Sequence, residues 1–146
     1  MQSDSSLNHL YKFLKEKKVF VVYLPLTFYW IILFIATTIP TDPLPKLFSA
    51  QDKVEHFGAY GILASLLYMT LHLQEKSRLL NQYAFGFSLF FLALYGAVDE
   101  LHQIFVPGRY CDILDWTADV SGGLIGLAII GVFLKKVSTN RLGIIE

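Results

Sequence analysis

The residues of this sequence that could do chemistry lie in three short polar stretches, and the first surrounds a histidine. Asp52, His56 and Tyr60 follow one another at intervals of four residues, so on a helix their side chains share one face. Lys53 lies beside that face. A histidine can accept or donate a proton, and a lysine can bind an anion. The stretch is therefore a candidate for acid–base chemistry or for binding a polar ligand.

The second and third stretches supply carboxylates. Asp99 and Gln103 lie one helical turn apart, with Glu100 between them. Asp115 and Asp119 are also one turn apart and open a later apolar run. An ionised carboxylate at the centre of a membrane helix costs roughly 2.5–3.5 kcal/mol on insertion scales. If these helices cross a membrane, Asp99, Glu100 and Asp119 must face other helices, water or a basic partner.

Lys53 and Arg109 are the cations that accompany these acids. The planar guanidinium of Arg109 suits paired hydrogen bonds to Asp99, to Asp115 or to a substrate phosphate. Such bonds would either bind a ligand or form a structural salt-bridge network that ties helix ends together. Both interpretations predict that Arg109 lies beside a carboxylate or an anionic group.

Simple structural roles explain some of the same residues. Asp52 and Asp115 stand at expected helix starts, where acids accept backbone N–H bonds. His56 and Tyr60 suit the interface between a membrane and water. For each residue taken singly, these structural roles are an alternative to a binding or catalytic role. They explain the combined set of residues less well.

Four apolar runs must position the polar stretches. Hydrophobic residues make up 54% of the sequence and charged residues 16%, which is too apolar for an ordinary soluble domain. Each run is about long enough to cross the ~30 Å hydrocarbon core of a bilayer as a helix. We therefore predict an all-α fold, a four-helix transmembrane bundle that forms one domain over residues 1–146. The expected spans are residues 19–39, 54–73, 83–106 and 116–134.

Chain-breaking residues separate these runs. Three prolines follow the first run, and a Pro-Gly pair follows the third. Residues 49–52 have the form of a capping box, so the second helix is expected to begin near Ala50. In the fourth run, Gly122 and Gly126 have the spacing that is typical of close helix packing.

The distribution of charge predicts the orientation of the chain. The 12 basic and 12 acidic residues cancel, so no net charge favours nucleic acid as a partner. Most Lys and Arg residues lie within residues 1–18, within the 74–82 link and in the tail, whereas Lys46, Lys53 and Arg109 lie on the other side. Because basic segments stay in the cytoplasm, we expect both termini there, with residues 1–18 as an amphipathic cytoplasmic segment. The polar stretches would then face outward, and the single cysteine excludes an internal disulfide.

Taken together, the polar stretches resemble those of the VanZ-like membrane proteins, a family named for an accessory protein of glycopeptide antibiotic resistance. Members carry Asp-Lys-x-x-His-x-x-x-Tyr, then Asp-Glu-x-x-Gln, then Gly-Arg, and finally Asp-x-x-x-Asn-x-x-Gly-x-x-x-Gly. The matching residues here are Asp52, Lys53, His56, Tyr60, Asp99, Glu100, Gln103, Gly108, Arg109, Asp115, Gly122 and Gly126. The departure is Asp119, a carboxylate where the family pattern has the amide of asparagine.

The resemblance implies a multi-pass protein of the bacterial cytoplasmic membrane with a binding site that faces outward. Its ligand would be a lipid-linked envelope precursor or a lipid-bearing glycopeptide antibiotic, with teicoplanin tolerance as one outcome. Lys53 and Arg109 would contact phosphate or carboxylate, and the acids and Gln103 would bind sugar or peptide groups. The expected substrate-binding residues are Asp52, Lys53, His56, Tyr60, Asp99, Glu100, Gln103, Arg109, Asp115 and Asp119.

An enzyme acting on a lipid-linked envelope precursor is the first alternative. His56 would be the general acid or base, oriented by Asp52 or by Asp99. Arg109 would stabilise charge that develops on a phosphoryl or acyl group. The catalytic residues would then be His56, Asp99 and Arg109.

A metal site and a transport function complete the set of hypotheses. No cofactor is expected, but Asp99, Glu100 and Asp115 offer the carboxylates that a hard divalent ion prefers, and Asp119 is a further candidate ligand. Proton-coupled transport is the weakest alternative, because the ionisable residues are confined to one end of the spans.

Overall fold

The computed structural model describes residues 2–40, 48 and 50–139, and each element in this part of the chain is a helix. In chain order the elements are α1 (Gln2–Glu16), the π-helical η1 (Val19–Tyr23), α2 (Leu24–Thr38), α3 (Gln51–Leu73), α4 (Arg78–Gln82), α5 (Ala84–Gln103) and α6 (Ile113–Thr139). No strand occurs among these residues, so the predicted all-α fold is confirmed.

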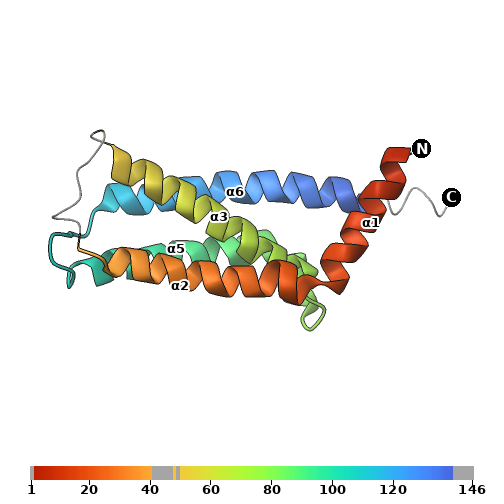
Figure 1. Ribbon diagram of the computed structural model, residues 1–146, viewed down its shortest axis with the longest axis horizontal. Coiled ribbons are helices and arrows are strands. Elements are labelled where there is room, and N and C mark those ends of the chain that lie inside the picture. The colour runs from red at the N-terminus through yellow and green to blue at the C-terminus, as the bar shows by residue number, and fades with distance from the viewer. Residues whose placement is uncertain (1, 41–47, 49, 140–146) are drawn as a thin grey trace.

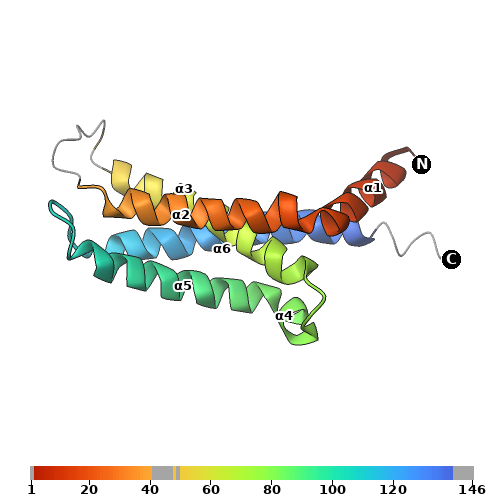
Figure 2. The ribbon, with the colours of Figure 1, turned by 60° about the horizontal axis from the view of Figure 1, so that its bottom comes forward.

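The long helices form an elongated bundle (Figure 1). α2, α5 and α6 follow its long axis, and α3 lies diagonally against α6. α1 and α4 lie at the end of the bundle where α6 finishes, as Figure 2 shows. The ends of α2 and α5 and the starts of α3 and α6 lie at the opposite end. The three polar stretches are thereby brought to one end of the molecule.

Within the described residues, three helices are long and apolar enough to cross a membrane. They cover Val19–Thr38, Ala84–Gln103 and Ile113–Ser138, with mean hydropathies of 2.3, 1.4 and 1.8. These segments correspond to the first, third and fourth expected spans, although the third ends and the fourth begins three residues earlier than predicted.

The outward surfaces of these helices are covered by large apolar side chains. Examples of such exposed side chains are Phe20, Phe28, Phe90, Ile129 and Val132. Soluble proteins rarely expose large continuous apolar surfaces, whereas lipid-facing helices do so along their whole length. The chain is therefore a multi-pass membrane protein.

α3 corresponds to the expected second span, residues 54–73, but does not belong to the three apolar helices. Its 23 residues are long enough, but the polar side chains of its first turns and His72 near its end lower its hydropathy. The structure therefore supports three apolar spans where the sequence predicts four. α3 begins after Ala50, as expected, while Ser49 of the expected capping box lies outside the described residues.

The end of the bundle that carries α1 is apolar inside. The buried residues there are Leu14, Val22, Leu73 and Leu134.

On the surface of this end, Glu75 binds Lys15 at 2.6 Å and Lys18 at 3.1 Å. These hydrogen bonds hold the pKa of Glu75 below its ordinary value of 4.5. The expected N-terminal segment thus forms a helix, Gln2–Glu16, that is anchored to the link after α3.

Glycines set the distance between α3 and α6. A Cβ atom added at Gly122 would lie 2.0 Å from the carbonyl oxygen of Phe57, and one at Gly126 would lie 2.2 Å from that of Gly61. No side chain fits at either position while the two backbones keep this separation. The packing role predicted for Gly122 and Gly126 is confirmed.

Candidate functional site

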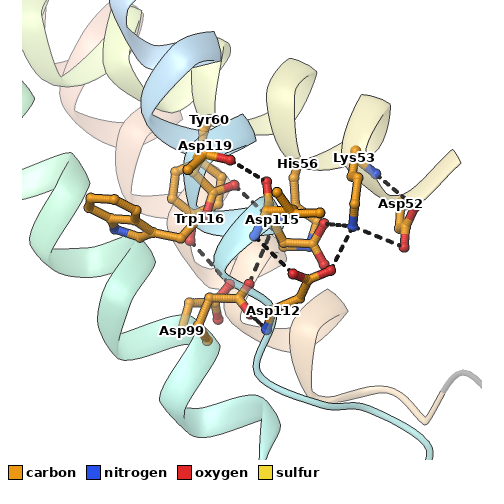
Figure 3. Close-up of polar contacts among 12 residues, drawn as sticks. Asp52, Lys53, His56, Tyr60, Asp99, Asp112, Asp115, Trp116 and Asp119 are labelled. Atoms are coloured by element: carbon orange, nitrogen blue, oxygen red, sulfur yellow. Dashed lines mark hydrogen bonds and ion pairs between the residues drawn. The ribbon is translucent and has the colours of Figure 1, made fainter. Parts of the chain in front are cut away.

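A polar cluster lies where α3 and α6 begin and α5 ends (Figure 3). The three polar stretches of the sequence thus meet in space. Five acidic or amide side chains of the cluster are buried, which is unusual for such groups unless partners hold them. The members of the polar cluster are Asp52, Lys53, His56, Tyr60, Asp99, Glu100, Gln103, Asp112, Asp115 and Asp119.

Lys53 binds the acids at the outer edge of the cluster. Its Nζ atom lies 2.7 Å from Oδ1 of Asp115 and 2.9 Å from Oδ2 of Asp112. Asp52 lies 3.6 Å from the same Nζ and also accepts the backbone N–H of Lys53 at 3.0 Å, as acids at helix starts do. The hydrogen bond from Lys53 holds the pKa of Asp112, in the loop before α6, below its ordinary value of 3.8. The ammonium group is therefore engaged by the chain's own carboxylates.

His56 pairs with Asp119 across the interface between α3 and α6. Nδ1 of His56 lies 2.9 Å from Oδ1 of Asp119, which is fully buried, and 4.0 Å from Oε1 of Glu100. The sequence predicts Asp52 or Asp99 as the acid that orients His56, and this prediction is wrong. α6 packs directly on the face of α3 that carries the ring, so a partner on α6 reaches it.

Asp99 binds Tyr60 instead. The Tyr60 hydroxyl donates to Oδ2 of Asp99 at 3.1 Å, and both side chains are buried. The Tyr60 ring also stacks on Tyr95 of α5, with 5.9 Å between ring centroids. Asp99 of α5 thus binds Tyr60, which lies one turn further along α3 than His56.

Arg109 binds the end of α2. Its Nε donates to the carbonyl oxygen of Ile39 at 3.0 Å, and its Nη2 donates to that of Ala36 at 2.9 Å. The last carbonyls of a helix have no partners within the helix, and a nearby arginine satisfies them well. The predicted salt-bridge network of Arg109, Asp99 and Asp115 is therefore wrong.

Asp112, and not Asp115, caps the start of α6. Oδ1 of Asp112 accepts the backbone N–H of Leu114 at 2.8 Å. The backbone N–H of Asp112 in turn donates to Oε2 of Glu100 at 2.8 Å. Asp115, for which capping was an alternative, binds the lysine of the cluster instead.

Two further residues outside the predicted site, Trp116 and Gly96, shape the cluster. Nε1 of Trp116 donates to the carbonyl oxygen of Ala93 at 2.9 Å and so joins α6 to α5. A Cβ atom added at Gly96 would lie 3.0 Å from Oδ2 of Asp119, so the glycine leaves room for that carboxylate. Gly96 precedes Asp99 by three residues on α5, and this shared helix face was the signal that could have identified it.

Three buried polar atoms of the cluster have no hydrogen-bond partner within the described part of the chain. They are Oε1 of Glu100, Nε2 of Gln103 and Oδ2 of Asp119. An unsatisfied buried donor or acceptor costs about 1–3 kcal/mol, and more when it is charged. A bound ion, ligand or water molecule would remove this cost, so the three atoms mark the part of the cluster that is suited to bind something.

Among the described residues, one group could hold a metal ion. His56, Glu100 and Asp119 each offer a ligand atom, and these atoms lie within 4.8 Å of one another. The predicted set of Asp99, Glu100 and Asp115 does not come together, because Asp99 binds a tyrosine hydroxyl and Asp115 binds a lysine. Glu100 belongs to both sets, and the further candidate Asp119 belongs to the group that the structure forms.

A model of the family described as VanZ/LLP1 matches residues 7–134 of the chain. The matched segment contains every residue of the polar cluster. No curated protein and no solved structure matches the chain.

Proposed function

Because the chain belongs to the VanZ-like family of membrane proteins, we propose that its polar cluster binds the polar part of a cell-envelope component. The component is a lipid-linked precursor or a lipid-bearing glycopeptide antibiotic. The observation that carries this proposal is the set of unpartnered buried atoms on Glu100, Gln103 and Asp119, which lie at one end of a membrane-embedded bundle. Such atoms gain more from a ligand than polar atoms that already have partners.

The chemistry of the cluster favours a ligand rich in hydrogen-bond donors. Two of the unpartnered atoms are carboxylate oxygens, which accept, and Nε2 of Gln103 donates. The two cations described at this end, Lys53 and Arg109, are engaged by acids and by carbonyls. Sugar hydroxyls, peptide N–H groups and amines therefore suit the cluster better than the phosphate contacts that the sequence suggests for these two cations.

We propose further that α3 is a fourth span and that the cluster faces outward. α3 reaches from the polar cluster to the apolar end at Leu73, the same two ends that the apolar helices connect. Basic residues support the orientation, because most of those described lie at the α1 end. They are Lys12, Lys15, Lys17, Lys18, Lys76, Arg78, Lys135 and Lys136, against Lys53 and Arg109 at the other end. Both termini would be cytoplasmic, in a single domain with residues 1–18 as its cytoplasmic segment.

Susceptibility to glycopeptides tests the proposed binding role. A Gram-positive host expresses the wild type, Gln103→Leu or Asp99→Asn at matched membrane abundance, with Glu75→Gln at the α1 end as control. We expect the wild type and Glu75→Gln to raise tolerance to teicoplanin more than to vancomycin, and the two cluster variants to lose the effect. If the wild type equals an empty vector, the resistance role is rejected, and binding of lipid-linked precursors to the purified protein in nanodiscs becomes the measurement.

Catalysis is a second candidate, favoured by the 2.9 Å contact between His56 and Asp119. A histidine paired with a buried carboxylate can act as a general base. In this version His56 is oriented by Asp119, with Glu100 beside it, in place of the set His56, Asp99 and Arg109 that the sequence suggests. Mass spectrometry of a lipid-linked precursor incubated with the purified protein tests it, and an unchanged precursor would reject it.

Proton-coupled transport has less support. The ionisable cluster occupies one end of the bundle, and the interior of the opposite end is lined by Leu14, Val22, Leu73 and Leu134. A proton path needs polar groups along its length, and none of these four side chains can carry a proton. Flux measured in liposomes with an imposed pH gradient would reveal such an activity.

A further inference from the structure

We propose that His56, Glu100 and Asp119 bind one divalent metal ion of the zinc or manganese class. Each residue comes from a different helix, α3, α5 and α6 respectively, so the ion would join three helices at the polar end of the bundle. One nitrogen and two carboxylate oxygens lie within 4.8 Å of one another. This inference goes beyond the proposed function, because it concerns the protein alone and requires no envelope ligand.

The orientation of Glu100 supports the site. Its Oε2 is held by the backbone N–H of Asp112 at 2.8 Å, while its Oε1 has no partner among the described residues and lies 4.0 Å from Nδ1 of His56. The Glu100 residue is only 3% exposed, so bulk water does not solvate this oxygen freely. Carboxylates that bind metals are commonly oriented in this way by a hydrogen bond to their second oxygen.

Asp119 supports the site from the other side. The residue is 0% exposed, its Oδ1 lies 2.9 Å from Nδ1 of His56, and its Oδ2 has no partner within the described residues. Gly96 leaves room beside Oδ2, since a Cβ atom there would lie only 3.0 Å away. A second buried carboxylate oxygen without a partner therefore belongs to the residue that contacts the histidine.

Charge explains why a divalent ion suits these three residues. Two ionised carboxylates and a neutral imidazole carry two negative charges, which a divalent ion neutralises. The nearest described ammonium group, that of Lys53, is already engaged by Asp112 and Asp115. Two buried carboxylates without a cation of their own are costly in a membrane protein, so an ion at this position would stabilise the fold.

The kind of ligand atoms selects the class of metal. Imidazole suits zinc and other transition metals, and carboxylates also suit manganese, whereas calcium and magnesium prefer oxygen ligands alone. Ligand atoms of one tetrahedral zinc ion lie roughly 3.4 Å apart, because each bond measures about 2.0–2.2 Å. The contacts of 2.9 and 4.0 Å from the histidine nitrogen bracket that value.

Asp119 makes the inference specific to this chain. The family pattern has asparagine at this position, and an amide oxygen binds a divalent ion more weakly than a charged carboxylate does. Asp119→Asn is therefore both a test of the ion and a substitution of nearly equal volume. Three protein ligands would leave further coordination positions open, as in zinc sites that also bind water or substrate.

Metal binding by the purified full-length chain tests the proposal. The protein in nanodiscs is treated with a chelator, and Zn²⁺ or Mn²⁺ is then titrated by calorimetry, with Mg²⁺ and Ca²⁺ for comparison. Bound metal per chain is measured by mass spectrometry after removal of excess ion. We expect one equivalent of Zn²⁺ or Mn²⁺, and an affinity at least about tenfold lower in Asp119→Asn, Glu100→Gln and His56→Gln. Glu75→Gln and His72→Gln, which change an acid and a histidine away from the site, should bind as the wild type does.

Co²⁺ provides a spectroscopic readout of the same site. Its visible spectrum reports the number and geometry of its ligands, and we expect the spectrum of the wild type to change in His56→Gln and to be kept in His72→Gln. All variants are first compared with the wild type by size-exclusion chromatography and thermal unfolding. The proposal is overturned if the wild type binds less than one ion per chain, or if correctly folded Asp119→Asn and Glu100→Gln keep the affinity of the wild type.

Discussion

Single residues join the three helices of the polar cluster, and Asp112 is the clearest example. One carboxylate oxygen binds Lys53 of α3, the other caps α6, and the backbone N–H binds Glu100 of α5. Because Asp112 lies in the loop between α5 and α6, the pH of the surrounding water acts on it directly. The integrity of the cluster should therefore depend on the ionisation of this residue.

Lowering the pH is expected to weaken this link. The hydrogen bond from Lys53 holds the pKa of Asp112 below 3.8, its ordinary value, so Asp112 is a stronger acid in the folded protein than in the unfolded chain. Its contribution to the free energy of unfolding is then present above the unfolded value and is lost as the pH falls through the lowered folded value. We expect the melting temperature in detergent to drop below about pH 4.

Substitution separates Asp112 from the other acids. Asp112→Asn removes the titrating group, so its melting temperature should be lower than that of the wild type near neutral pH and should fall less on acidification. Glu16→Gln, which changes an exposed acid paired with Lys12, should keep the acid dependence of the wild type. An acid dependence that is identical in Asp112→Asn and the wild type would contradict the expectation.

At the scale of elements, the close approach of α3 and α6 decides whether the cluster forms. A Cβ atom at Gly122 would lie 2.0 Å from the backbone oxygen of Phe57, so Gly122→Ala must push the helices apart. We expect a loss of about 1–3 kcal/mol in the free energy of unfolding. The loss should be accompanied by loss of any ligand or metal binding, because His56 and Asp119 lie on the two separated helices.

Another glycine of α3 supplies the control. A Cβ atom at Gly58 would meet nothing within 4 Å, and alanine is favoured over glycine inside a helix. Gly58→Ala should therefore leave stability unchanged or raise it by up to about 1 kcal/mol. Reversible unfolding of both variants in the same detergent gives the comparison, and equal effects would show that the helices do not approach as closely as described.

Arg109 acts on the end of α2. Arg109→Ala removes two charge-assisted hydrogen bonds to the carbonyls of Ala36 and Ile39. Because these bonds are exposed, we expect a loss of only about 1 kcal/mol, with faster hydrogen exchange in the last turn of α2. If Arg109→Ala loses teicoplanin tolerance while hydrogen exchange in α2 stays unchanged, the result would instead favour the ligand-binding role that the sequence suggests for Arg109.

At the scale of the whole molecule, α3 shows how a polar helix can belong to a membrane bundle. It lies against α6 and also contacts α2 and α5, so much of its surface faces protein. A helix that is shielded by its neighbours needs fewer apolar residues than one that faces lipid. The polar composition of α3 is therefore compatible with a span, although composition alone identifies only the other three helices.

The native cysteine offers a direct test of orientation. Cys111 is exposed and lies in the loop between α5 and α6, next to the polar cluster. If the cluster faces outward, a thiol reagent that cannot cross membranes should label Cys111 in intact cells. Cys111→Ser should remove the label, and Cys111→Ser combined with Lys76→Cys should restore it only after the membrane is permeabilised. If Cys111 is labelled only after permeabilisation and the cysteine at position 76 is labelled in intact cells, the cluster faces the cytoplasm.

The sequence by itself determined the long helices and which end of the bundle is polar, whereas the short helix α4 lies within the stretch that the sequence assigns to a link. These features are local patterns: apolar runs of membrane length, prolines between them and glycines spaced four apart. Helix formation and membrane insertion depend on such local patterns and not on which helices become neighbours. Spacing also placed His56 and Tyr60 on one face of α3. The sequence patterns also identified nearly all members of the polar cluster without any knowledge of how the helices pack.

Only the tertiary structure decided which of these residues are partners. The sequence suggested Asp52 or Asp99 as the acid that orients His56, but the glycine-lined contact between α3 and α6 places Asp119 beside it. The long side chain of Arg109 was expected to bind acids, but the position of α2 brings two carbonyl oxygens to it instead. Partners on different helices depend on crossing angle and separation, which are set by the packing of all the helices together and are not encoded in the spacing within any one of them.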